Sequence, residues 1–96
     1  MEIYKDNHDI SRSINLELSS DRLTIDSYDR GNGFSEERII TVEDIASLKI
    51  AMNVEADDDF LLEQLKADYS KVNGIDLFVD FLTDHDVKYI YHRFTD

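Results

Sequence analysis

The hydrophobic pattern changes its period near residue 41, and this change limits the fold more than any other feature of the 96-residue chain. Before that point apolar residues recur at every second position, as at Ile14, Leu16 and Leu18. Such alternation is typical of strands with one buried face. After it they recur every third or fourth position, which is typical of amphipathic helices. The sequence therefore predicts an α+β fold with a strand-rich half followed by a helix-rich half.

Three strands are expected in the first half, at residues 13–18, 23–25 and 38–42. Ser19-Ser20-Asp21 has the composition of a turn, and so does the Asp-Arg-Gly-Asn-Gly stretch at 29–33, where Asn-Gly can take positive φ. Ile3 and Tyr4 can add a short edge strand at the start.

Three helices are expected in the second half, each with its own apolar stripe. Thr41 is expected to cap the first helix, because acidic residues follow it in the first turn. The second helix is expected to begin around residues 57–59, and the third after Gly74. The predicted inward-facing residues are Ile45, Leu48 and Met52 for the first helix, Leu61, Leu62, Leu65 and Tyr69 for the second, and Ile75, Phe78, Val79 and Leu82 for the third.

The segment 87–91, Val-Lys-Tyr-Ile-Tyr, is expected to return to the sheet as a final strand because it is rich in aromatic and β-branched residues. On such a strand Tyr89 and Tyr91 share one face, and Ile90 on the other face is predicted to lie in the core. The tyrosines can be core residues or interface anchors. The predicted order is β-β-β-α-α-α-β, a single domain whose antiparallel sheet carries helices packed on one face.

The composition narrows the classes of function. The chain carries 22 Asp and Glu against 10 Lys and Arg, a net charge of −12. Direct binding to nucleic acid or to anionic lipid requires a cationic surface and is therefore not expected. The chain has no cysteine, no basic-apolar leader and no apolar run of about 18 residues, so a cytoplasmic protein is expected.

Negative charge is concentrated in residues 43–86, where twelve acidic residues face three lysines, a net of −9. Asp76, Asp80 and Asp84 follow one another at i, i+4 and i+8 and so share a helix face, although like charges at this spacing disfavour a helix slightly. The row is either a solvated outer face or a surface that docks on a cationic protein. The candidate partner-binding residues are Asp57, Asp58, Asp59, Asp76, Asp80, Asp84, Asp86, Tyr89 and Tyr91.

Asp26, Gly31 and Glu37 occupy the first, sixth and twelfth places of an EF-hand calcium-binding pattern. Tyr28 and Arg30 stand where the pattern requires oxygen ligands, and a strand is expected before the loop in place of a helix. No calcium site is therefore predicted.

Histidine-based chemistry also lacks a supporting motif. His8, His85 and His92 are far apart and show no metal-binding spacing, and no nucleophile elbow or phosphate-binding loop is present. We therefore predict no catalytic residue, no metal and no cofactor.

Taken whole, the chain resembles the small acidic immunity proteins that protect bacteria from polymorphic or contact-dependent inhibition toxins. The likeness lies in its size, its acidity and the segments 4–8, 13–18 and 87–91. The resemblance implies tight one-to-one binding of a cognate toxin, often a basic nuclease, and implies no individual residue roles. Two alternatives share the electrostatics: a nucleic-acid mimic of the phage anti-restriction or anti-CRISPR type, and an acidic interaction module without inhibitory function.

Overall fold

The computed structural model describes residues 1–7, 10–19, 21–31, 33–53 and 57–95. Five strands form one antiparallel sheet in the order β1-β2-β3-β4-β5, and three helices lie between β4 and β5 in sequence. The strands are β1 (Glu2–Asn7), β2 (Ser11–Leu18), β3 (Leu23–Gly31), β4 (Phe34–Val42) and β5 (Ile90–Thr95). The helices are α1 (Ile45–Ala51), α2 (Asp58–Tyr69) and α3 (Gly74–Asp84).

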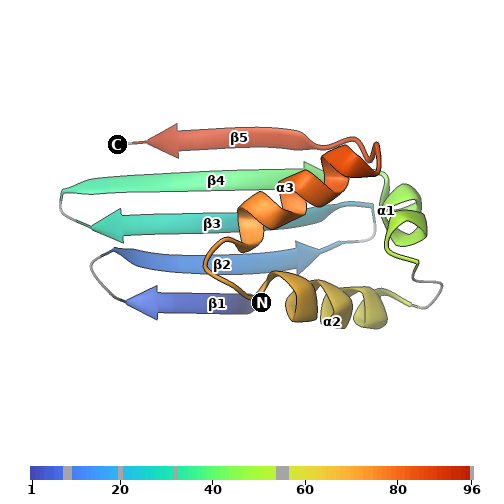
Figure 1. Cartoon of the computed structure of the whole chain (residues 1–96), viewed down its shortest axis with the longest axis horizontal. Coiled ribbons are helices and arrows are strands. Elements are labelled where there is room, and N and C mark those ends of the chain that lie inside the picture. Colours follow the sequence, from blue (N-terminus) through green and yellow to red (C-terminus); the bar gives the residue numbers. More distant parts are fainter. Residues whose placement is uncertain (8–9, 20, 32, 54–56, 96) are drawn as a thin grey trace.

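The predicted α+β class and element order are confirmed, with β1 as the additional strand at the start. Each strand pairs with the strand before it in sequence, and the chain passes through all three helices between β4 and β5. Figure 1 shows α3 crossing the sheet obliquely, α2 lying on the β1 side and α1 beyond the end of the strands.

The core lies between the helices and one face of the sheet. Residues directly opposite one another in neighbouring strands point to the same side, so the register identifies this face. The buried apolar residues are Ile3, Ile14, Leu16, Leu23, Ile25, Ile40 and Val42 from the sheet, Leu48, Leu61, Leu65, Tyr69, Ile75, Phe78 and Leu82 from the helices, and Val87. The predicted stripes are confirmed, except that Ile45, Met52, Leu62 and Val79 are only partly buried.

Capping carboxylates determine where the first two helices begin. Asp57 accepts a hydrogen bond from the backbone N–H of Phe60 at 3.1 Å, and Asp44 accepts one from that of Ser47 at 3.0 Å. The prediction that Thr41 caps the first helix was wrong, because Thr41 belongs to β4 and pairs with Thr24. The period change at Thr41 marks the end of β4, and the cap of α1, Asp44, follows three residues later.

Gly74 allows α2 and α3 to meet at a close turn. A Cβ atom at this position would lie 2.0 Å from the carbonyl oxygen of Tyr69, a distance that no side chain tolerates, and 3.3 Å from Ile14 of β2. The ring of Tyr69 packs edge-on against Phe78, with centroids 5.1 Å apart. The glycine therefore positions α3 over the sheet.

The strand boundaries differ from the prediction in two places. Strand β3 continues to Gly31 and β4 begins at Phe34, so most of the predicted turn at 29–33 belongs to β3. Gly33, between the two strands, has a φ of 81°. Two residues of the predicted turns, Ser20 and Asn32, lie outside the described residues. The final strand covers 90–95 and not 87–91, and Ile90 is 43% exposed, which contradicts its predicted place in the core. The register gives the reason: Tyr91 lies opposite the buried Ile40, so its neighbour Ile90, opposite Thr41, points to the face of the sheet away from the core.

Candidate protein-binding surfaces

A groove of about 430 Å³ separates α3 from β5 and collects four of the nine predicted binding residues. Asp76 and Asp80 line it from α3, and Tyr89 and Tyr91 line it from the segment entering β5, with Val79 as a further wall. The hydroxyl groups of Tyr89 and Thr83 lie 3.4 Å apart, which ties the entering segment to the end of α3. The structure thus joins carboxylates and tyrosines that are separated in sequence.

Asp76 is paired with a cation, which lowers its value as a docking residue. Its Oδ1 accepts a hydrogen bond from Arg38 of β4 at 2.8 Å, and Arg38 is also 3.6 Å from Glu36. Arg93 of β5 donates to Glu36 at 2.9 Å. Two arginines and two carboxylates therefore neutralise one another at this end of the groove.

Asp80 and Asp84 continue the row along the exposed side of α3, and neither has an ion-pair partner among the described residues. The buried residues of α3 are Gly74, Ile75, Phe78 and Leu82, which places the aspartate row on the opposite side of the helix. Asp86 follows α3 in an exposed turn with a φ of 55°. This part of the predicted site is therefore uncompensated negative charge on a solvent-facing surface.

The three aspartates at 57–59 belong to a different part of the molecule. Asp57 caps α2, and Asp58 forms a 3.1 Å ion pair with Lys49 of α1, while Asp59 is exposed in the first turn. Figure 1 places α2 on the β1 side of the sheet, away from the groove beside β5. The nine predicted residues are therefore not one site, and the local roles of Asp57 and Asp58 explain their presence without a partner.

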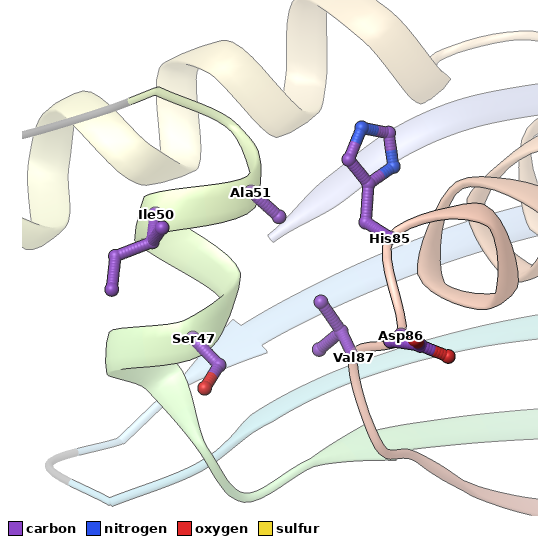
Figure 2. Close-up of a pocket in the computed structure, with 6 residues that line it drawn as sticks. All are labelled: Ser47, Ile50, Ala51, His85, Asp86 and Val87. Carbon is purple, nitrogen blue, oxygen red and sulfur yellow. The ribbon is translucent and has the colours of Figure 1, made fainter.

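A second depression brings a serine, a histidine and an aspartate together between α1 and the turn that follows α3 (Figure 2). Ser47 Oγ lies 2.6 Å from Asp44 Oδ2, within the cap of α1. His85 Nδ1 lies 2.9 Å from the carbonyl oxygen of Phe81, on whose ring the imidazole stacks. In Figure 2 the His85 ring and the Asp86 carboxylate point away from Ser47, so these side chains do not form a hydrogen-bonded triad.

The two histidines that the structure describes, His85 and His92, share no site. His92 lies on β5 with its ring stacked on Phe94, and His85 lies at the end of α3. His8 lies outside the described residues, as do Glu55 and Asp96. Within the described ranges, no group of three or more potential metal ligands is gathered. No helix in that part of the chain has both the length and the apolar character needed to cross a membrane.

The helix-free face of the sheet carries an apolar patch that the sequence analysis missed. The register places Ile90, His92 and Phe94 of β5 beside Ile39 of β4 and, one strand further, Tyr28 of β3. Phe94 is 56% exposed and Tyr28 is 41% exposed. The signal was present in the alternation Ile90, His92, Phe94, but the predicted strand ended at residue 91.

Two neighbouring carboxylates also occupy this face. Burial raises the pKa of Asp26, and the negative charge of Glu37 raises that pKa further. Asp26 lies opposite Asn15 and Ile39, and neither of these residues supplies a compensating charge. The face is thus apolar along β5 and acidic toward its centre.

Comparisons of the chain with family models, with curated proteins and with solved structures found no match.

Proposed function

We propose that this protein binds a cationic partner protein through the exposed side of α3 and the adjoining groove, and that it acts as an immunity-type inhibitor of a toxin. The observation that carries the proposal is the unpaired charge of Asp80 and Asp84 beside the tyrosine-lined groove. Carboxylates without an internal cation can exchange water for a partner's lysines or arginines, whereas paired ones such as Asp76 must first give up a bond.

The two kinds of side chain in the groove would act at different stages of binding. Exposed carboxylates attract a basic protein over distances of about a Debye length, roughly 8 Å at physiological salt, and so raise the association rate. Tyr89 and Tyr91 offer flat rings with a polar tip, the combination favoured at the energetic centre of interfaces. A basic nuclease covered in this way would lose access to its nucleic acid.

The electrostatics alone would equally fit a nucleic-acid mimic that inhibits a host nuclease. The ion pair between Asp76 and Arg38 supports the toxin inhibitor over the mimic. It leaves two free carboxylates in the row on α3, which is short for an imitation of an extended phosphate backbone.

The experiment begins with affinity capture from the source cells, using the whole chain as bait. The expected product is a basic protein whose toxicity the chain suppresses when the two are co-expressed. The double variant Asp80→Asn/Asp84→Asn should then reduce the association rate about three- to tenfold at low salt and flatten its salt dependence. The matched control is Glu17→Gln/Asp21→Asn, which removes the same charge from exposed positions outside the helices.

An association rate reduced equally by both double variants would show that net charge, and not this surface, guides binding. Tyr89→Ala should instead accelerate dissociation, because it truncates a ring within the groove at a position outside β5. If neither pair of aspartates nor the tyrosine affected binding of the captured partner, the proposed surface would be refuted.

A further inference from the structure

Among the residues that the structure describes, no strand pairs with the outer side of β5. Strand β5 pairs with β4 on one side only, and all six of its residues are exposed. Natural edge strands are commonly protected by lysine, proline, a bulge or a covering element, since an unpaired backbone edge attracts other strands. The β4–β5 register runs without a shift from Thr41 to Glu36, and the strand contains neither lysine nor proline.

The opposite edge has the protection that β5 lacks. Strand β1 carries Lys5, and its pairing with β2 is interrupted by a register shift between Glu2 and Tyr4. Its Ile3 is buried in the core, and α2 lies on this side of the sheet (Figure 1). The two edges of this sheet therefore differ: the β1 edge is protected, and the β5 edge is open.

The charge around β5 also differs from that of the rest of the molecule. Residues 87–95 contain Lys88 and Arg93 and no carboxylate, in a chain with a net charge of −12. Two copies of such an acidic chain repel one another over most of their surfaces. At β5, where the segment itself carries two cations and no carboxylate, this repulsion is reduced.

The sequence of β5 complements itself when two copies run antiparallel with His92 opposite His92. Ile90 then faces Phe94 of the other copy on the helix-free side, and Tyr91 faces Arg93 on the helix side. The first pair is apolar and the second allows a cation–π contact. The two residues of each pair lie on the same face of the joined sheet. The core faces of the two sheets therefore align with each other, and so do their helix-free faces.

We propose that the protein forms a homodimer through antiparallel pairing of β5 with β5 of a second copy, centred on His92. The pairing joins the two five-stranded sheets into one and places both helical layers on the same side. It satisfies the free backbone groups of the edge and covers Ile90 and Phe94, the exposed apolar residues of the patch nearest the axis. The aspartate rows of both copies remain exposed.

The first test is sedimentation equilibrium of the whole chain over a range of concentrations. The expected result is a reversible dimer that tightens as salt rises to about 0.15 M, because salt screens the repulsion between two acidic chains. Ile90→Lys, which adds the natural protection of an edge, should weaken the dimer at least tenfold although it makes each chain less acidic. Tyr28→Lys is the control, since Tyr28 is similarly exposed on the same face but lies two strands from the edge.

The second test uses the absence of cysteine from the chain to examine the register. Directly opposite positions in antiparallel strands have Cβ atoms about 5 Å apart, near the span of a disulfide, so His92→Cys should form a disulfide-linked dimer under mild oxidation. Phe94→Cys should not, because the two positions would be separated by four residues, or about 14 Å, along the strands. Circular dichroism of each variant confirms that the fold is retained.

A chain that stays monomeric throughout the concentration range would overturn the proposal and leave the edge available to a strand of a different protein. Equal crosslinking of the two cysteine variants would overturn the register. Dimerisation unaffected by Ile90→Lys would place the interface elsewhere. None of these results depends on a toxin.

Discussion

The two edge strands of the sheet have opposite environments. In β1, Ile3 is 7% exposed and contributes to the core, and the amino group of Met1 donates to the carbonyl oxygen of Leu16 at 2.8 Å. In β5 every residue is exposed, and its apolar side chains form the border of an uncovered patch. The β1 edge thus contributes to the stability of the fold, and the β5 edge contributes a surface.

The same contrast holds for the ion pairs on the helix side of the sheet. Arg12 of β2 contacts Asp29 of β3 through two hydrogen bonds of 2.6 Å and donates a third bond to the carbonyl oxygen of Val72, before α3. Arg93 of β5 makes one bond to Glu36 and is largely exposed. The ion pair between Arg12 and Asp29 is thus largely buried, whereas the cation of the pair on β5, Arg93, is largely exposed to solvent.

The largest expected difference between the edges concerns their isoleucines. Ile3→Ala should lower the free energy of unfolding by about 2–4 kcal/mol, because it leaves a cavity in the core. Ile90→Ala should cost less than about 1 kcal/mol, because the side chain is already half-exposed. Urea denaturation at a protein concentration where the chain is monomeric measures both values. Equal losses would remove the distinction between the two edges.

The ion pairs provide a second, smaller contrast. Arg12→Met keeps the aliphatic stem but leaves the buried carboxylate of Asp29 without its cation, and should cost about 1.5–3 kcal/mol. Arg93→Met should cost at most about 1 kcal/mol, as for other exposed pairs. Thermal unfolding of the two variants at neutral pH provides the comparison, and a larger loss for Arg93→Met would contradict it.

The smallest expected effect lies on the helix-free face, between the two edges. The raised pKa of Asp26 means that the folded state holds this proton more tightly than the unfolded state does. Ionised Asp26 therefore opposes folding at neutral pH, and its cost falls as the pH decreases through the raised pKa. Asp26→Asn should stabilise the protein by up to about 0.5 kcal/mol at neutral pH, a small gain because the site is partly solvated.

Unfolding measured as a function of pH tests this prediction, with Glu63→Gln, an exposed carboxylate of α2, as the control. The gain from Asp26→Asn should vanish below the ordinary carboxyl pKa of 3.8, where both states carry the proton. Destabilisation at neutral pH would show instead that the charged form of Asp26 has a favourable partner.

Those parts of the candidate site that depend on local spacing could be predicted from the sequence. The periodicity of α3 placed Asp76, Asp80 and Asp84 on one face, opposite Ile75, Phe78 and Leu82. It did not reveal that Asp76 is neutralised by Arg38, because the two residues are 38 positions apart and meet only after α3 packs over β4. It also grouped the aspartates at 57–59 with the row on α3, although they lie on another helix with roles of their own.

The sequence by itself determined the class of the fold, the order of its elements and the acidity of its helices, because alternation, helical spacing and charge are local properties of the chain. Only the tertiary structure decided which strand forms each edge, which carboxylates are paired and which apolar residues stay exposed. Val87 and Ile90 show the reason: both are apolar, but Val87 packs in the core and Ile90 points to the helix-free face of the sheet. Burial depends on what lies opposite a side chain in space, and neighbours in sequence do not specify this.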